Sequence, residues 1–184
     1  LNCFSGKREK LSFVLVLAGS KTAEIEGISA AGSTSASRKY TAVADAELLL
    51  FGPGKSRRWP LPPLEAGVSP ALISHVASSW LGISPVVIAV GLSQSPPFPH
   101  LRLEPTSLGP AECLSKGNAM QLSRVNSLWR KGFSMGKRLV HPLVLAECVP
   151  GGTTTAQAVL SGLGLSVSDL IGSSVLRSPV ALKK

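Results

Sequence analysis

The stretch that decides the fold runs from residue 143 to residue 164: Leu143-Val-Leu-Ala-Glu-Cys-Val-Pro-Gly-Gly-Thr-Thr-Thr-Ala-Gln-Ala-Val-Leu-Ser-Gly-Leu-Gly164. Its apolar start, residues 143–146, predicts a buried strand. Residues 150–152, Pro-Gly-Gly, predict a turn that frees the backbone. Thr154, with Gln157 three residues later, fits a capping box and predicts the start of a helix.

The helix expected after this turn bears on chemistry as well as on packing. Its apolar face would consist of Val159, Leu160 and Leu163. A glycine turn that leads into a helix N-terminus presents N–H groups and the positive end of the helix dipole, so the junction suits phosphate. From the pattern alone, a turn that binds nothing is about equally common.

The composition is typical of one globular domain with a basic surface. Of the 184 residues, 44% are hydrophobic and 16% are charged, which predicts a packed core rather than disorder. The net charge of +9 arises from 19 basic and only 10 acidic residues, and it favours anionic ligands. Aromatic residues make up 5% and the basic residues are spread out, so the charge fits phosphorylated metabolites at least as well as RNA.

Cysteine usage and hydropathy bear on the compartment. Cys3, Cys113 and Cys148 are odd in number and far apart, which argues against a disulfide framework or zinc site and fits a reducing cytoplasm. A reactive thiol is one interpretation of Cys148, and a small buried filler is a much more common one. Residues 7–18 mimic a signal peptide, but the apolar part is short and a buried strand over residues 11–18 is the better interpretation. No stretch of the sequence approaches the roughly 18 apolar residues that span a membrane.

The first half of the chain alternates strands with helices. Residues 11–18 and 86–90 are apolar runs that predict buried parallel strands. Between them, residues 42–50 predict a helix that runs into a short strand at 48–51. Residues 70–81 predict a second helix, with serine as its cap and proline at its first position. The core-facing positions of this second helix would be Leu72, Ile73, Val76, Ala77, Trp80 and Leu81.

The second half predicts an excursion and then a long helix. Residues 94–118 are rich in proline and are expected to lie outside the core. Residues 119–140 predict an amphipathic helix, on which Arg124, Lys131 and Arg138 form a basic stripe. Such a stripe is most often a solvated face and less often a phosphate or RNA contact. The core-facing positions of the helix would be Leu122, Val125, Leu128 or Trp129, and Leu139.

Strands that alternate with helices in this order predict a doubly wound, mostly parallel sheet flanked by helices, a Rossmann-like α/β domain over residues 1–184. Ligands of such sheets bind at the carboxyl ends of the strands. We therefore expect the loop at residues 19–32, the end of the strand at Gly91 and the turn at residues 147–155 to lie along one rim. Asp45 and Glu47 are either a pair of site carboxylates or acids near a helix start.

Taken together, these segments resemble the nicotinate-nucleotide–dimethylbenzimidazole phosphoribosyltransferases, and most of all their archaeal and cyanobacterial branch. Residues 147–156 are similar to the glutamate, glycine-rich and Thr-Thr-Ala turn of that family. Further segments agree in order and spacing over most of the chain: Leu15–Leu17, Gly27–Gly32, Tyr40–Ala42, Asp45–Glu47, Pro70–Ile73 and Val86–Leu92. The resemblance implies a doubly wound enzyme that is longer than this chain, and this chain would be its N-terminal portion.

The resemblance also implies an activity. The family moves phosphoribose from nicotinate mononucleotide to a benzimidazole-type base and so makes the lower-ligand nucleotide of cobalamin. It implies a homodimer whose partners are these two substrates, with no metal and no organic cofactor. The cysteine usage and the hydropathy described above add a cytoplasmic location and no membrane partner.

By position, the resemblance assigns roles to individual residues. Glu147 would orient ribose hydroxyls or the nicotinate side. The phosphate or ribose of the nucleotide would be held by Gly151, Gly152, Thr153 and Thr154. The base pocket would be lined by Ser29, Ala30 and Thr41.

The chain departs from the family at several positions. The general-base glutamate lies in the second half of the longer enzymes, so it would be absent from this chain and the catalytic residues here are unassigned. Ser20-Lys21 stands where the longer enzymes carry Asp-His, Ala31 replaces an aromatic residue beside the base pocket, and Val43 replaces a glutamine. The sequence therefore does not fix which base is accepted.

Three hypotheses from different classes follow. The leading one is part of a phosphoribosyltransferase, expected to be inactive without its second half. The alternative is a non-catalytic nucleotide- or phosphate-binding module. The third is a basic RNA-associated protein, which rests only on the net charge and the basic stripe and is ranked last, because no RNA-recognition motif is present.

Overall fold

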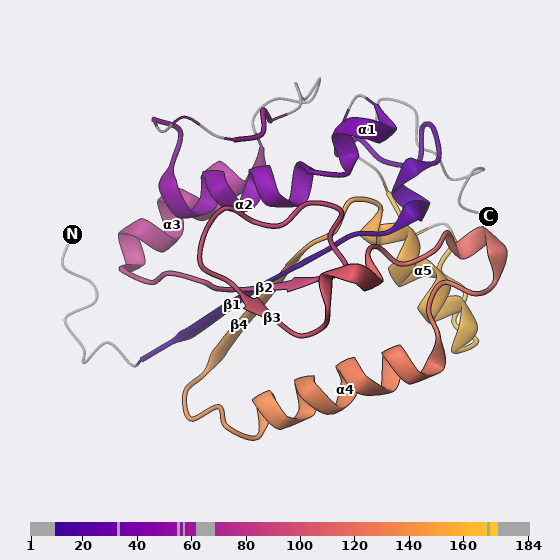
Figure 1. Ribbon diagram of the computed structural model, residues 1–184. Helices are drawn as coiled ribbons and strands as arrows, with labels where there is room; N and C mark the ends of the chain where they lie inside the picture. The colour runs from indigo at the N-terminus through magenta and orange to yellow at the C-terminus, as the bar shows by residue number, and fades with distance from the viewer. Residues whose placement is uncertain are drawn as a thin grey trace.

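Within the described residues, four parallel strands form the centre of the structure, in the order β3-β2-β1-β4 (Figure 1). They are β1 (Ser12–Ala18), β2 (Val86–Val90), β3 (Leu101–Arg102) and β4 (Leu143–Cys148). The computed structural model describes residues 10–32, 34–54, 56, 58–61, 69–168 and 170–172. Each of the strand pairs is parallel, and helices flank the sheet, which confirms the predicted Rossmann-like α/β class.

Strand β1 lies inside the sheet, and it pairs with β2 on one side and with β4 on the other along most of its length. Val16 of β1 lies between Ile88 of β2 and Glu147 of β4. Every second side chain is buried, as the period of a strand requires. These buried side chains are Phe13, Leu15 and Leu17. The predicted first buried strand is confirmed.

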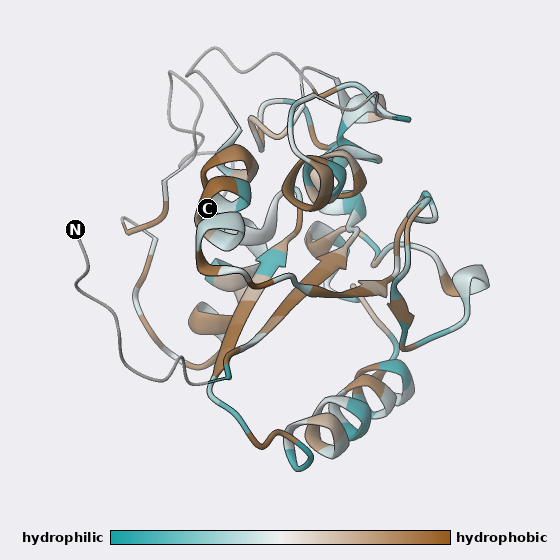
Figure 2. Ribbon diagram, turned by 90° about the vertical axis from the view of Figure 1, so that its left-hand side faces the viewer, coloured by the Kyte–Doolittle hydropathy of each residue, from teal (hydrophilic) through white to brown (hydrophobic). Residues whose placement is uncertain are grey.

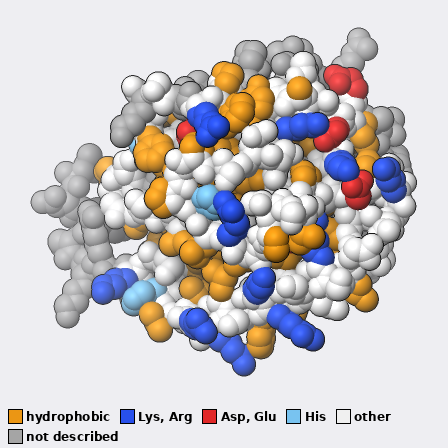
Figure 3. All heavy atoms as spheres, viewed as in Figure 1, with side chains coloured by type: hydrophobic (Ala, Val, Ile, Leu, Met, Phe, Trp, Pro, Cys, Tyr) orange, Lys and Arg blue, Asp and Glu red, His pale blue; other side chains and the backbone are white. Residues whose placement is uncertain are grey.

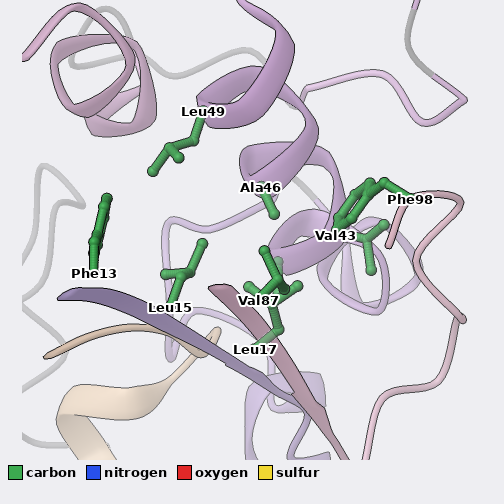
Figure 4. Close-up of a cluster of buried hydrophobic side chains, with 9 residues drawn as sticks. Phe13, Leu15, Leu17, Val43, Ala46, Leu49, Val87 and Phe98 are labelled. Carbon is green, nitrogen blue, oxygen red and sulfur yellow. The ribbon is translucent and has the colours of Figure 1, made fainter. Parts of the chain in front are cut away.

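Helix α2 (Thr41–Phe51) packs on one face of the sheet, and α3 (Pro70–Leu81) packs beside α2 (Figures 1 and 2). Figure 4 shows the core where α2 meets the sheet: Phe13, Leu15, Leu17, Val43, Ala46, Leu49, Val87 and Phe98. The predicted short strand at 48–51 is wrong. Leu48 and Leu49 are buried as part of the helix, which continues to Phe51 and ends at Gly52, whose φ of 77° closes it.

Helix α3 begins and ends where the sequence predicts. The Ser69 hydroxyl accepts from the Ala71 N–H, and Gly82 adopts the left-handed conformation with φ 67°. Its predicted core face is only partly correct. Leu72 is half-buried, whereas Ile73, Val76, Ala77, Trp80 and Leu81 are exposed. Its main contact is with α2, so most of its apolar side chains have no layer to pack against among the described residues.

Helix α4 (Leu122–Gly136) lies on the opposite side of the sheet from α2 (Figures 1 and 2). The prediction that its apolar positions face the core is wrong for four of them, which are exposed, with Trp129 at 76%: Leu122, Val125, Trp129 and Leu139. Leu128 is half-buried. Its polar side instead faces the chain, because Arg124 forms an ion pair with Glu104 in the segment before the helix.

Strand β4 and helix α5 (Gly152–Gly162) also leave apolar side chains uncovered. The predicted burial of residues 143–146 is wrong, since Leu145 is 67% exposed. On α5, Val159 and Leu163 are exposed, and Leu160 is half-buried. The strand and the helix form as predicted, and Ala146 packs against the core, but Leu145, Val159 and Leu163 have no cover among the described residues.

The remaining elements are short. They are η1 (Lys21–Glu24), α1 (Ser35–Arg38), η2 (Thr106–Leu108) and η3 (Leu114–Lys116). The expectation that residues 94–118 lie outside the core is partly wrong, because Phe98 packs in the core and β3 extends the sheet. In the part of the chain that the structure describes, no helix is long and apolar enough to cross a membrane.

Candidate functional site

The carboxyl ends of three strands meet around one small hollow. Its lining includes Gly19 after β1, Leu92 after β2 and Pro150 after β4. The predicted convergence of these segments on one rim is therefore confirmed. The hollow is completed by side chains of the segment between β1 and α2, namely Ser20, Ala23, Glu24, Ser35, Arg38 and Lys39.

This rim lies where the strand order reverses. From β1 the chain passes over α2 and α3 to β2 on one side of it, and it returns past α4 to β4 on the other side. The two connections run over opposite faces of the sheet (Figure 1). In open α/β sheets, ligands bind in the crevice at such a reversal, outside the carboxyl ends of the strands.

The glycine turn after β4 begins α5 earlier than the sequence predicts. Gly151 takes the left-handed conformation, with φ 73° and ψ 12°, and the helix starts at Gly152. The predicted capping box is wrong, because Thr154 and Gln157 lie inside the helix and no side chain caps it. The Gly152 N–H donates to the Val149 carbonyl at 2.8 Å, so part of the turn is closed by its own backbone.

Glu147 lies directly beside this turn. A Cβ built on Gly152 would stand 3.3 and 3.4 Å from the two carboxylate oxygens of Glu147. Partial burial of the carboxyl raises the pKa of Glu147, and the hydrogen bond from the Val149 backbone lowers it in part, while the residue as a whole stays exposed. An ionised carboxylate only accepts hydrogen bonds, so it suits hydroxyl donors rather than a second anion.

The inward face of α5 is polar, which the sequence did not reveal. Thr154 and Gln157 are buried, and their Oγ1 and Oε1 atoms have no hydrogen-bond partner among the described residues. A buried oxygen without a partner costs about 1–3 kcal/mol. Their spacing of three residues places both on one side of the helix. The same spacing fits a capping box, so the sequence pattern does not distinguish a cap from a buried polar face.

The predicted base-pocket residues lie in the loop after β1. The Thr41 hydroxyl donates to the carbonyls of Ala31 and Ser37, and the Ser29 hydroxyl accepts from the Ala31 N–H at 3.2 Å. Ser29 and Ala30 are half-buried. None of Ser29, Ala30 and Thr41 lines the hollow, so their role in binding a base stays a prediction.

Arg38 fixes the shape of this loop, and no sequence motif pointed to it. Its side chain is buried and donates to the carbonyls of Ala23, Ile25 and Gly32. It also pairs with Glu26 at 3.6 Å. The only signal in the sequence was an arginine inside a segment of small residues, where a guanidinium has several backbone carbonyls within reach.

Asp45 and Cys148 form a second polar contact under the rim. Asp45 accepts from the Ser69 hydroxyl at 2.7 Å and from the Cys148 thiol at 3.8 Å. Burial raises the pKa of both groups, so the thiol is protonated near neutral pH. Cys148 is half-buried and packs against the core, which fits the filler interpretation. Glu47 is also buried, and its Oε2 atom has no partner among the described residues.

The basic stripe predicted on residues 119–140 faces the protein in part. Arg124 is only 12% exposed and binds Glu104, and Lys131 donates to the Leu103 carbonyl. The interpretation of this stripe as a solvated face is therefore wrong for Arg124. Figure 3 shows Lys and Arg side chains spread over the visible face, without one continuous basic patch. Among the described residues no group of three His, Cys, Asp or Glu side chains is arranged to hold a metal ion.

Fold and site together define a parallel α/β protein with a glycine turn and a carboxylate at the reversal of its strand order. No known family model matches the sequence. The chain is 66% identical over 173 residues to a UPF0284 protein of Prochlorococcus marinus (strain MIT 9313), covering 94% of this chain and 43% of that protein.

Other relatives agree with this similarity. The chain is 62% identical to a UPF0284 protein of Parasynechococcus marenigrum (strain WH8102) and 46% identical to one of Cyanothece sp. (strain PCC 7425). These matches cover 93% and 95% of this chain, but only 43% and 47% of the relatives. The chain thus spans about half the length of the curated relatives that it matches, and the name UPF0284 states no activity.

Proposed function

We propose that this chain carries the nucleotide-binding part of a phosphoribosyltransferase-like protein of cobalamin lower-ligand synthesis. The complete protein would move phosphoribose from nicotinate mononucleotide to a benzimidazole-type base. The proposal concerns a protein longer than this chain, because the chain spans less than half of each relative named above.

The observation that carries the proposal is the contact between Glu147 and the glycine turn. The Glu147 carboxylate lies against Gly152 at the start of α5, on the rim where the strand order reverses. A nucleotide offers two kinds of polar group to such a junction. Its phosphate suits the positive end of the α5 dipole and the Thr154 hydroxyl, and its ribose hydroxyls suit the Glu147 carboxylate as donors.

This division of roles fits the chemistry of glycosyl transfer. The transition state has oxocarbenium character, so a carboxylate near the ribose stabilises the positive charge that develops there. A held phosphate and a fixed ribose reduce the entropy that the reaction must lose. Under this proposal, Glu147 binds and orients the donor, while the base that activates the acceptor comes from residues outside this chain.

The test is calorimetric titration of the chain with nicotinate mononucleotide. Gly152→Ile is the diagnostic variant, because even its Cβ would stand 3.3 Å from the Glu147 carboxylate. Gly162→Ile, at the other end of α5 with no atoms near its Cβ position, is the matched control. We expect saturable binding that Gly152→Ile abolishes and Gly162→Ile retains. Absence of binding at millimolar ligand would mean a binding free energy weaker than about 4 kcal/mol, and it would refute the proposal for this chain.

The alternative is a nucleotide- or phosphate-binding module without chemistry. The observation that favours it is the glycine turn at the start of α5, because the positive end of a helix can bind an anion without taking part in a reaction. A full-length relative separates the two functions. Release of nicotinate that depends on both a benzimidazole-type base and the glutamate equivalent to Glu147 supports transfer, whereas binding without release supports the module.

A further inference from the structure

A second cavity, distinct from the hollow at the glycine turn, opens at the carboxyl ends of β2 and β3. Its volume is about 330 Å³, within the size range of small-ligand pockets. Ala89, Leu92, Pro96 and Pro105 contribute apolar surface to it. Leu92 and Ser93 also line the hollow, so the two spaces adjoin along the rim.

Arg102 brings a positive charge to this cavity. Its Nη2 atom donates to the Ser95 hydroxyl at 3.0 Å and lies 3.3 Å from His100 Nε2. Neither partner is an acid, and no ion pair to Arg102 is present among the described residues. A guanidinium has five N–H donors in a planar fork, so most of its donors are available to a ligand.

His100 orients this guanidinium. Its Nδ1 atom lies 2.8 Å from the Phe98 carbonyl, which can only accept, so Nδ1 carries the ring proton. Nε2 is then the ring atom with a lone pair, and it accepts from Arg102. Phe98 is buried in the core, so the chain of contacts from Phe98 through His100 fixes Arg102 against a rigid part of the fold.

The acid beside Arg102 does not cancel its charge. Glu104 lines the same cavity, but it is buried and binds Arg124 through both carboxylate oxygens, at 2.9 and 2.6 Å. Arg124 also donates to the Gly109 carbonyl at 2.7 Å. Since Glu104 and Arg124 neutralise each other, the charge that remains at the cavity is that of Arg102.

We propose that this cavity is a binding site for a small oxyanion ligand, a carboxylate or a phosphate, with the Arg102 guanidinium as its anchor. Planar guanidinium and oxyanion groups match as paired hydrogen bonds. Ser95 contacts the anchor, Ser93 and Thr106 also line the cavity, and the apolar residues of the lining would receive the body of the ligand. The site is independent of the glycine turn and stands whether or not that turn binds nucleotide.

The test is amide NMR of the isotope-labelled chain with three probes. Benzoate supplies a carboxylate, inorganic phosphate supplies a compact oxyanion, and benzamide matches benzoate without the charge. Arg102→Met removes the charge and keeps much of the apolar stem. Arg130→Met, at an exposed position on α4, is the matched control for net charge. Gly152→Ile separates this site from the proposed nucleotide site.

We expect benzoate or phosphate to shift the amides of residues 93–102 in a saturable manner, and benzamide to shift none. Arg102→Met should weaken the affinity by at least about tenfold, because it removes hydrogen bonds to a charged group. Arg130→Met and Gly152→Ile should leave the affinity unchanged. Whichever of the two anions saturates identifies the source of the oxyanion. Equal affinities in Arg102→Met and Arg130→Met, or no saturation by either anion, would overturn the proposal.

Discussion

At the scale of single residues, the conformation of Gly151 is the sharpest feature of the candidate site. Its φ of 73° is left-handed, and a Cβ built on it would stand 3.4 Å from the Cα of Ala23, in the segment after β1. Gly151→Ala should destabilise the chain by about 1–2 kcal/mol, because a side chain is strained in this conformation. Urea unfolding measures the loss.

Gly162→Ala is the control for the Gly151 substitution. Gly162 is the last residue of the same helix, lacks a left-handed φ and has no atoms near its Cβ position. Alanine there should be neutral or stabilising by up to about 1 kcal/mol, because it restricts the unfolded chain. Equal losses of stability at the two glycines would show that the left-handed turn is not strained by a side chain.

Asp45 makes a prediction about pH. Its pKa is raised mainly by burial, and the Ser69 hydroxyl lowers it in part. The folded state therefore keeps the proton to higher pH than the unfolded state, so stability falls as the pH rises from the unfolded pKa through the folded one. Asp45→Asn removes this titration and retains an oxygen for Ser69. We expect the variant to gain stability relative to wild type across that interval.

Unfolding curves measured from pH 3 to pH 8 test the Asp45 prediction. The difference in free energy of unfolding between Asp45→Asn and wild type should grow with pH and then level off above the raised pKa. A difference that is constant over the whole range would contradict it, because burial would then not perturb the Asp45 carboxyl.

At the scale of elements, α4 is held by charge rather than by its apolar side. Arg124 and Glu104 are both largely buried, and they bind through two hydrogen bonds. Arg124→Met leaves the Glu104 carboxylate buried without its partner, which should cost about 3–5 kcal/mol. The double variant with Glu104→Gln should recover part of this loss. Thermal or urea unfolding of the single and double variants measures both effects.

Arg130→Met is the control for this ion pair, because Arg130 is exposed on the same helix. Its substitution should change stability by no more than about 0.5 kcal/mol. If Arg124→Met were as mild as Arg130→Met, the ion pair would not be what attaches α4 to the chain.

The elements were more predictable from sequence than the faces they bury. Periodicity and end signals located β1, β2, α3 and α4, because the signals lie within each segment. The orientation of α4 depends on an ion pair between residues 20 positions apart, Glu104 and Arg124, which no local pattern reports. Helix α5 begins at Gly152, directly after the left-handed Gly151, and not at Thr154 as the sequence predicts. The prediction is wrong because Thr154 and Gln157 have the spacing of a capping box that does not form.

In the candidate site, too, some features were predictable from the sequence and others were not. The convergence of three strand ends on one rim followed from parallel topology and was predictable. Arg38 and the cavity at Arg102 were not, because each depends on contacts between side chains and backbone carbonyls or hydroxyls that only the folded loops bring together.

At the scale of the whole molecule, a large apolar surface has no cover among the described residues. It includes the apolar side of α4 and much of β4, with Trp129, Phe133 and Leu145 among the exposed side chains. Surfaces of this kind associate in water. We expect the purified chain to self-associate, and Trp129→Glu with Phe133→Glu to shift it toward monomer without lowering its melting temperature.

Size-exclusion chromatography with light scattering measures this association. Ser123→Glu with Ser127→Glu is the control, because it adds the same charge to α4 at exposed polar positions. If the control dissociated the chain equally well, general repulsion would be the cause rather than loss of the apolar contact. A wild-type chain that is monodisperse and monomeric would contradict the prediction.

The attachment of the loop after β1 has a consequence for how its specificity can change. Arg38 holds this loop through the carbonyls of Ala23 and Ile25, which every amino acid possesses. The course of the loop, and with it the shape of the hollow, therefore depends on main-chain atoms. The groups that a ligand would meet there are side chains such as Glu24 and Lys39. Substitutions at such lining positions can retune the ligand preference of the hollow while the loop keeps its course, so shape and selectivity are free to evolve separately.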